Sequence, residues 1–562
     1  MSGEKAGGYI SQITFNNGES VCIEKNDIVV FVGPNNAGKS QSLKDIFALS
    51  GKKVPSVVVS DVCIKKYNAP VSVLLDCIST CVDSGGSKNY RLLGSSFYVY
   101  NFSDSSFLTT PFFEDYRNLF VANLDTARRL TICDPPTSIT RDSPKAHPIH
   151  YAAFDGSYRK WLSDNFKKAF GIELTPNTQY GASIPLCIGK PVKLDGEYED
   201  EQTRQEAYAD ILSTYKQVQN QGDGIKSFTG ILLYLMLDNF CTYLIDEPES
   251  FLHPPQAKIM GQIIGETLSD DQQAFISTHS EEVLKGLLEV CPERVKIVRI
   301  TRENDTNYFS VLDNESFYGV WNDPLLKHSN IMSSLFHKTV VLCESDSDCK
   351  MYSIIDNHIK QSEGKYSETL FIHCGGKHRM AKIASALRML NVDVKLIPDI
   401  DILNDETIFK GIVEAFGGIW ESIKTDYNIV VSNLHSPQER VVRSVAKAAI
   451  NMVFSKSEST NLSAKDISEI RDAVKTVSKW DNIKKCGSAA IPAGDATAAY
   501  GRIEKTLRRI GIYIVHVGEL ECFVREVGGH GPEWVNAVLE AYPDLDSGVY
   551  SMINNFIKNI GL

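Results

Sequence analysis

The segment GPNNAGKS at residues 33–40 constrains the fold of this chain more than any other part of its sequence. It follows a β-branched and aromatic run at residues 27–32 and precedes a helical pattern that continues to about residue 49. In the pattern GxxxxGK[ST], the glycines let backbone N–H groups close around phosphate, and the next helix begins with the positive end of its dipole. The order of strand, loop and helix therefore predicts a phosphate-binding loop in an α/β domain.

The polar residues of this loop predict a site for ATP and Mg²⁺. We expect Lys39 to reach the β- and γ-phosphates and Ser40 to ligate the metal ion. The other loop residues assigned to nucleotide binding are Gly33, Asn35, Asn36 and Gly38. The alternative, a glycine turn that binds nothing, is disfavoured because the loop lies between a strand and a helix.

Two later strand patterns end in polar residues that would complete this site. Residues 241–245 end at Asp246 and Glu247, and residues 273–278 end at His279. We expect Asp246 to hold Mg²⁺ through water and Glu247 to polarise the attacking water. We expect His279 to contact the γ-phosphate region. The alternatives are an ordinary acidic turn and an ordinary surface or core histidine.

The alternation of strands and helices restarts near residue 338, which predicts a second α/β domain with mainly parallel strands. Its strand patterns cover residues 338–343, 370–374, 393–398 and 511–517. We therefore predict an N-terminal domain at 1–336 and a C-terminal domain at 337–562. Residues from about 51 to 215 are expected to be an insertion in the first domain, and residues from about 404 to 495 a largely helical insertion in the second.

Carboxylates follow two strands of the second domain. Glu344 closes the first strand and Asp348 lies just beyond it, whereas Asp399 and Asp401 follow a later strand. Because parallel strands end at one edge of a sheet, these side chains are expected to converge, and their repulsion would require a cation. Oxygen ligands of this kind suit Mg²⁺ or Mn²⁺, and such a site can cleave phosphodiesters. Solvated loop acids are the alternative.

Basic residues are grouped in the same half of the chain, although the formal charge of the whole chain is −12. This net charge argues against a polycation that coats nucleic acid, but it allows a local groove. Three helical stripes predict such a groove for DNA, with solvated helix faces as the alternative. The stripes are Arg440, Arg443 and Lys447, then Arg471, Lys475 and Lys479, then Lys505, Arg508 and Arg509.

The N-terminal motifs resemble an ABC-type ATPase of the SMC and OLD (overcoming lysogenisation defect) kind. The resemblance rests on residues 33–40, on DEPES at 246–250 with Leu-His-Pro at 252–254, and on STHS around His279. It implies a signature loop upstream of the Walker B strand, which is the strand that ends at Asp246 and Glu247. The segment QGDGIKS at 221–227 lies at that place and supplies Gly222 and Gly224. In that family the signature loop completes the nucleotide site of the opposite subunit, so the resemblance implies a dimer or a higher homo-oligomer.

The C-terminal motifs resemble a Toprim domain, and the two halves together resemble the OLD family of ATPase-nucleases. The resemblance implies that Glu344 is a metal ligand or general base. It implies metal ligation by Asp348, Asp399, Asp401 and Glu521, the last in the acidic motif after Gly518. Gly375, Gly376 and Lys377 match the glycine turn after the second Toprim strand. The family also uses a late lysine as a catalytic cation, for which Lys505 and Arg525 are the candidates.

The OLD resemblance implies a nucleotide-gated, metal-dependent DNA endonuclease with a role in anti-phage defence. It implies a partner from a Gabija- or retron-like system, such as a helicase-like protein or a reverse transcriptase with its DNA or RNA product. The inserted residues from about 51 to 215 would hold oligomer contacts. Whether ATP activates or restrains cleavage is left open.

Two other functions are compatible with the same motifs. One is a nucleotide-switched sensor or scaffold that binds nucleic acid without cleavage, and the other is a repair ATPase that acts on DNA ends.

The sequence shows no apolar run near the roughly 18 residues that span a bilayer, and its start lacks the pattern of a signal peptide. Thirteen cysteines occur without CxxC pairs, so we expect a cytoplasmic protein that does not bind membranes.

Overall fold

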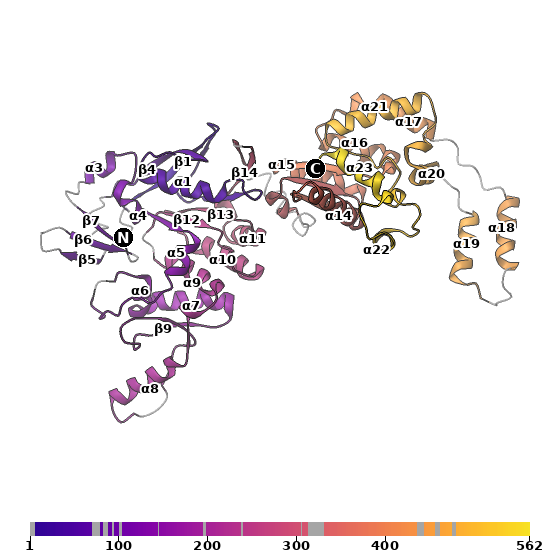
Figure 1. Ribbon diagram of the computed structural model, residues 1–562. Coiled ribbons are helices and arrows are strands. Elements are labelled where there is room, and N and C mark those ends of the chain that lie inside the picture. The colour runs from indigo at the N-terminus through magenta and orange to yellow at the C-terminus, as the bar shows by residue number, and fades with distance from the viewer. Residues whose placement is uncertain are drawn as a thin grey trace. The chain divides into compact units, whose positions relative to one another are not determined.

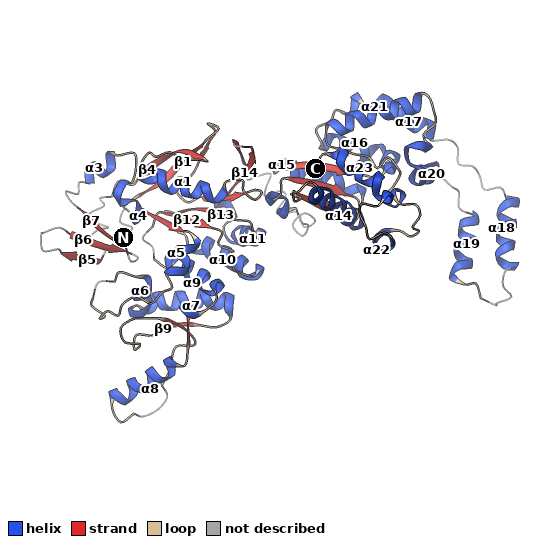
Figure 2. Ribbon diagram, viewed as in Figure 1, coloured by secondary structure: helices blue, strands red, loops and turns tan. Residues whose placement is uncertain are grey.

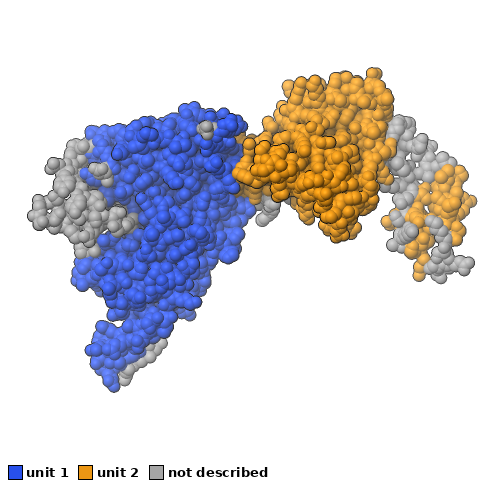
Figure 3. Space-filling view, in the orientation of Figure 1, with its two compact units in different colours: residues 1–314 blue, residues 315–562 orange. Residues whose placement is uncertain are grey.

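The computed structural model describes residues 6–69, 79–82, 88–92, 95–99, 104–143, 145–194, 198–237, 240–304, 306–312, 331–434, 443–455, 461–474 and 479–562. The chain forms two compact units, residues 1–314 and residues 315–562 (Figure 3). Each unit has its own parallel sheet with helices around it, as the alternation of strands and helices predicts (Figure 2). None of the described helices combines the length and the apolar character needed to cross a membrane.

The first unit is built on a six-stranded sheet in the order β15-β14-β3-β13-β12-β8. Five of these strands are parallel, and only β15 runs antiparallel, beside β14. The central strands β3 and β13 are buried along their whole length, which explains their continuous apolar sequences. The six strands are β3 (Ile28–Val32), β8 (Val121–Leu124), β12 (Thr242–Asp246), β13 (Gln273–Ser277), β14 (Val295–Glu303) and β15 (Thr306–Val311).

Helix α1 (Lys39–Gly51) contacts both this sheet and a smaller antiparallel sheet in the order β2-β1-β4 (Figure 1). The other small sheets have the orders β5-β6-β7 and β11-β10-β9. Their strands are β1 (Gly8–Phe15), β2 (Ser20–Cys22), β4 (Val59–Lys66), β5 (Ser79–Val82), β6 (Lys88–Leu92), β7 (Ser95–Val99), β9 (Leu174–Pro176), β10 (Leu186–Ile188) and β11 (Lys216–Gln217).

The remaining helices of the first unit pack mainly on one another, with α5 against α9 and α10 against α11. Helix α9 is apolar and almost wholly buried from Ser227 onward, because it packs among other elements of the unit. These helices are α3 (Asp104–Thr109), α4 (Arg117–Phe120), α5 (Thr126–Thr131), α6 (Pro148–Phe154), α7 (Gly156–Phe170), α8 (Glu201–Ser213), α9 (Asp223–Leu235), α10 (Pro254–Thr267) and α11 (Glu281–Val290).

The second unit contains a parallel sheet in the order β17-β16-β18. Its largest buried side chains include Trp534, Tyr352 and Tyr550, which share one apolar core with β16. The strands are β16 (Thr339–Cys343), β17 (Thr369–His373) and β18 (Asp393–Ile397). The helices are α14 (Asp346–Ser362), α15 (Met380–Met389), α16 (Glu406–Ala415), α17 (Lys424–Leu434), α18 (Arg443–Ser455), α19 (Ala464–Val474), α20 (Lys479–Cys486), α21 (Asp495–Arg509), α22 (Gly531–Ala541) and α23 (Ser551–Ile560).

The strand predicted at residues 511–517 does not form a continuous ladder. The structure has two isolated parallel bridges there, Leu396 with Ile512 and Asp399 with Val515. Between the bridged positions lies Pro398, which has no N–H to donate and so interrupts the hydrogen bonding. The segment still follows β18, because Tyr513 N donates to the carbonyl oxygen of Leu396 at 2.8 Å.

The buried carboxylate of Asp45 fixes α1 to the start of β4. One of its oxygens accepts from the backbone N–H groups of Val57, Val58 and Val59 at 2.7–3.1 Å, and the other accepts from Gln41.

We expect Asp45→Ala to destabilise the first unit by about 3 kcal/mol, because buried backbone donors would lose their acceptor. Thermal unfolding and hydrogen exchange of the three amides would measure the loss. Lys44→Ala, at an exposed position of the same helix, is the control; equal protection in both variants would contradict this account.

Candidate functional site

The phosphate-binding loop is shaped by backbone contacts that only glycine allows. A Cβ on Gly33, where φ is +142°, would lie 2.0 Å from the carbonyl oxygen of Ile300 in β14. The buried Lys39 ammonium donates to the carbonyl oxygens of Gly33 and Pro34 at 2.8 and 2.7 Å. Burial lowers the pKa of Lys39 to about 8, although Glu247, Glu249 and Asp246 oppose this shift. A phosphate bound in the loop would replace these carbonyl oxygens as the partner of the Lys39 ammonium.

The acidic pair after β12 lies at the same sheet edge as this loop, because β12, β13 and β3 are parallel. The Asp246 carboxylate accepts a hydrogen bond from the Ser277 hydroxyl. Glu247 has a φ of +47°, which is rare for a residue with a side chain, and its N–H donates to the carbonyl oxygen of Ser277 at 2.9 Å. Strain of this kind is typical of functional sites.

His279 joins this group at the end of β13. Its Nε2 lies 3.5 Å from Glu247 Oε1, and its backbone N–H donates to Glu249 Oε1 at 2.6 Å. Burial and the nearby charge of Lys39 lower the pKa of His279. The structure therefore brings Lys39, Asp246, Glu247 and His279 together, and Ser40 and Asn36 belong to the same loop and helix start.

Gly222 and Gly224 lie at the start of α9, beside the segment that follows the acidic pair. Gly222 precedes the first helical residue, and a Cβ on Gly224 would lie 2.5 Å from the carbonyl oxygen of Phe251. The glycine at 224 is therefore required for close backbone packing. A signature-loop role for these residues remains a prediction.

Two supporting residues of this site were missed by sequence reasoning. Asn307 on β15 is buried and donates through Nδ2 to the carbonyl oxygen of Ala37 at 2.6 Å, so it supports the loop from a distant strand. Glu249 holds the His279 backbone, and burial raises its pKa. Asn307 belongs to no motif, so its role is visible only in the structure, whereas Glu249 lies within the DEPES motif at 246–250.

In the second unit, three predicted ligands converge. Glu344 follows β16, and Asp399 and Asp401 follow β18; one carboxylate oxygen from each lies within 4.8 Å of the other two. Glu344 Oε2 and Asp401 Oδ1 are buried without a hydrogen-bond partner among the described residues. Burial raises the pKa of both Glu344 and Asp399, and the neighbouring carboxylates raise each further. Converging, unpartnered oxygens of this kind match the donor set of a hard divalent cation.

Two lysines stand beside these carboxylates. Lys377 Nζ lies 3.1 Å from Asp401 Oδ2, and Lys484 Nζ on α20 lies 3.8 Å from the same atom. Burial alone would lower the pKa of Lys484, but Asp401, Asp399, Glu519 and Glu344 raise it above its usual value. Lys484 is therefore a cation at the acidic cluster that sequence reasoning missed, because it lies before the late acidic motif and within a segment predicted to be an insertion.

The two predicted late cations lie elsewhere. Lys505 is exposed on α21. Arg525 is also exposed, and its Nε donates to the carbonyl oxygen of Cys522 at 3.4 Å. The structure thus places Lys484, rather than either of these residues, beside Asp401.

Asp348 and Glu521 lie in a neighbouring group. The buried Asp348 caps α14, where its Oδ2 accepts from the Ser345 N–H at 2.8 Å. Burial raises its pKa, and the charge of Glu521 adds to this shift. Glu521 shares a separate cluster with Glu519 and His530, with ligand atoms within 4.8 Å of one another. Sequence reasoning missed His530, whose Nδ1 lies 2.6 Å from Glu521 Oε1.

The basic residues occupy several surfaces of the second unit. Arg443 and Lys447 are exposed on α18, and Arg471 is exposed on α19. Arg508 on α21 pairs with Glu504 at 2.8 Å, near the exposed Arg509. Arg440 and Lys475 lie outside the described residues, and of Lys479 only the backbone is described. The DNA groove stays a prediction.

Comparisons with known proteins bear on the first unit. A family model described as "AAA domain, putative AbiEii toxin, Type IV TA system" matches residues 178–285, which include Asp246, Glu247 and His279. No curated protein matched the sequence. Together with the loop and the acidic pair at one sheet edge, the family match supports an ATPase domain in this part of the chain, and such domains use nucleotide and usually Mg²⁺.

Solved structures similar to the chain include SMC head domains. The SMC head bound to the C-winged helix domain of ScpA has 13% identity and a TM-score of 0.32, and the match covers 56% of this chain and 100% of that chain. The SMC head domain from Thermotoga maritima has 15% identity and a TM-score of 0.29, covering 54% of this chain and 99% of that chain.

The lowered pKa of Lys39 predicts pH-dependent nucleotide binding. Lys39 is charged below about pH 8 and neutral above it, and a triphosphate favours the charged form, so ATP affinity should fall as the pH rises. We expect binding about tenfold weaker near pH 9 than near pH 7, measured by calorimetry with Mg²⁺ present. Lys39→Arg should flatten the curve, because arginine stays charged. Parallel curves for the two proteins would exclude Lys39 as the titrating group.

Proposed function

We propose that this protein is an ATP-binding and ATP-hydrolysing, divalent-metal-dependent DNA endonuclease of the OLD family, in which nucleotide gates cleavage. The observation that carries the proposal is the convergence of Glu344, Asp399 and Asp401, two of which have buried oxygens without a partner among the described residues. By resemblance, its biological role would be anti-phage defence with a second protein component.

The ATPase half of the proposal rests on the sheet edge where β3, β12 and β13 end. Lys39 would bind the β- and γ-phosphates, and Ser40 and Asp246 would hold Mg²⁺. Glu247 would orient and deprotonate the attacking water, with His279 beside it at the γ-phosphate. Gly222 and Gly224 would complete the site of a second subunit, which makes a homodimer the minimal active form.

The nuclease half assigns the cluster of Glu344, Asp399 and Asp401 to one Mg²⁺ or Mn²⁺, with Asp348 and Glu521 as neighbouring ligands. A divalent ion bound there would supply an activated water and charge stabilisation at the leaving oxygen. Lys484 would stabilise the negative charge that develops on the phosphate, because it lies beside Asp401 and its pKa is raised. Lys377 would hold Asp401 in place.

One observation favours a second candidate function, a nucleotide-switched scaffold that binds nucleic acid without cutting it. Lys377 and Lys484 both lie near the same oxygen of Asp401, so part of the negative charge is already neutralised by the protein. Retained DNA binding without cleavage, under all metal and nucleotide conditions, would support this function over the nuclease.

The nuclease assignment predicts different effects for the basic residues. Glu344→Ala and Asp399→Ala should abolish cleavage of plasmid DNA with Mg²⁺ or Mn²⁺ while DNA binding remains. Lys484→Gln should lower the cleavage rate by about 10²–10³, as expected for loss of one transition-state contact. Arg525→Gln is the matched control, with an expected rate near that of the unmodified protein. Full activity in Lys484→Gln, or its loss in Arg525→Gln, would refute the assignment.

The ATPase assignment predicts a separation of binding from hydrolysis. Glu247→Gln should lower ATP turnover by about 10²–10⁴, because a glutamine cannot accept the proton of the attacking water, whereas nucleotide affinity should be nearly unchanged. Phosphate release and calorimetry measure the two quantities. Glu266→Gln, at an exposed position of α10, is the control. Normal turnover in Glu247→Gln would mean that another residue is the base.

A further inference from the structure

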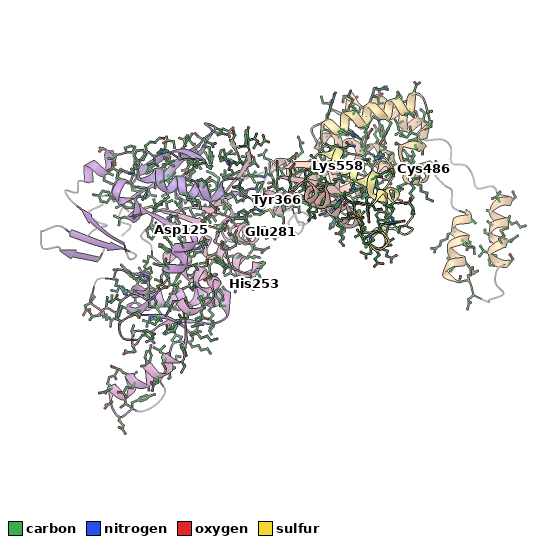
Figure 4. The ribbon with its side chains drawn as sticks, in the orientation of Figure 1. Asp125, His253, Glu281, Tyr366, Cys486 and Lys558 are labelled. Atoms are coloured by element: carbon green, nitrogen blue, oxygen red, sulfur yellow. The ribbon has the colours of Figure 1, made fainter. Side chains whose placement is uncertain are left out.

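The first unit contains a fully buried arginine that no motif contains. Arg129 lies on α5. This helix begins after Asp125, which is labelled in Figure 4 and follows the end of β8. Its relative exposure is 0%, which is rare for arginine unless the charge is paired. Its Nη1 donates to the backbone carbonyl oxygen of Asp246, and its Nη2 donates to Thr126 Oγ1 at 3.3 Å.

Arg129 faces the acidic residues of the ATPase site. Burial lowers its pKa, but Asp246, Glu249 and Glu247 act in the opposite direction and favour the charged form. Among the residues that the structure describes, Arg129 Nε has no hydrogen-bond partner, and neither has Glu249 Oε2. A buried donor of Arg129 and a buried acceptor of Glu249 are therefore both left without a partner among the described residues, and each carries an uncompensated desolvation cost.

The backbone of Arg129 also contacts the helix that begins at the predicted signature loop. A Cβ on Gly230 of α9 would lie 2.1 Å from the carbonyl oxygen of Arg129, so α5 and α9 are in backbone contact. One turn away, Cys133 Sγ donates to the carbonyl oxygen of Lys226 at 3.2 Å. If the Asp246 peptide moved, the Arg129 side chain would move with it, and the close backbone contact between α5 and α9 would displace α9.

We propose that Arg129 is a positioning residue of the ATPase site. It holds the carbonyl oxygen of Asp246 and thereby fixes the peptide that gives Glu247 its positive φ, and it connects this peptide to α9. The inference rests on the proposed ATPase function and extends it with a residue that acts through Asp246 and Glu247. The planar guanidinium supplies two donors at fixed angles, which a lysine cannot do.

The test compares Arg129→Met and Arg129→Lys with Arg294→Met in the full chain. Arg294 is a suitable control because it also supports the first unit through backbone carbonyl oxygens, those of Asn26, Leu268, Ser269 and Gln272. For each protein, kcat and KM for ATP hydrolysis, ATP affinity and Tm would be measured.

We expect Arg129→Met to lower kcat by at least about 30-fold with KM and ATP affinity within about threefold, because misplacement of the base affects the reaction more than binding. Arg129→Lys should recover part of kcat, since it keeps the charge and one donor. Arg294→Met should lower Tm but leave kcat within about threefold. If Arg129→Met does not fold, Arg129→Lys is compared with Arg294→Met instead. A larger loss in kcat for Arg129→Lys than for Arg294→Met then supports the inference.

Two results would overturn the inference alone: kcat losses in the Arg129 variants no larger than in Arg294→Met, or a raised KM at unchanged kcat. Absence of ATP hydrolysis by the unmodified protein would instead overturn the proposed ATPase function, and the inference with it. The two failures are therefore distinguishable.

Discussion

Parallel strand pairing is the constraint on which both candidate sites depend. In the first unit, β3, β13 and β12 lie side by side and end at one edge, so residues far apart in sequence supply Lys39, Glu247 and His279 to one place. In the second unit, β16 and β18 do the same for Glu344 and Asp399. The apolar strands themselves carry no chemistry, but their register decides which polar residues meet.

The acidic cluster of the second unit contains charge that the protein alone does not fully compensate, because carboxylates outnumber the lysines beside them. In the first unit, burial makes the charged form of Lys39 costly, whereas carbonyl oxygens and the nearby carboxylates of Glu247, Glu249 and Asp246 favour it. A cation bound in the second unit would relieve an existing electrostatic cost, which distinguishes this cluster from solvated surface charges.

The residues that follow apolar strands could be predicted from sequence, because a strand pattern and its polar end are local features. The α/β fold and the convergence of Glu344, Asp399 and Asp401 were accessible in this way. Lys484, Asn307 and Arg129 were not, because each reaches its site from a different element through a contact between distant parts of the chain. Residues 511–517 were predicted to form a continuous strand, but they form two isolated bridges instead. The cause is Pro398 on the neighbouring segment, which has no N–H to donate, and the sequence of 511–517 alone does not reveal it.

The hydrogen bond between Asn307 and Ala37 joins the phosphate-binding loop to β15, the antiparallel strand at one edge of the six-stranded sheet. Because a side chain from this distant strand holds the backbone of the loop, a change in loop geometry on phosphate binding would alter the hydrogen bond. The edge of the sheet would therefore respond to whether the loop is occupied.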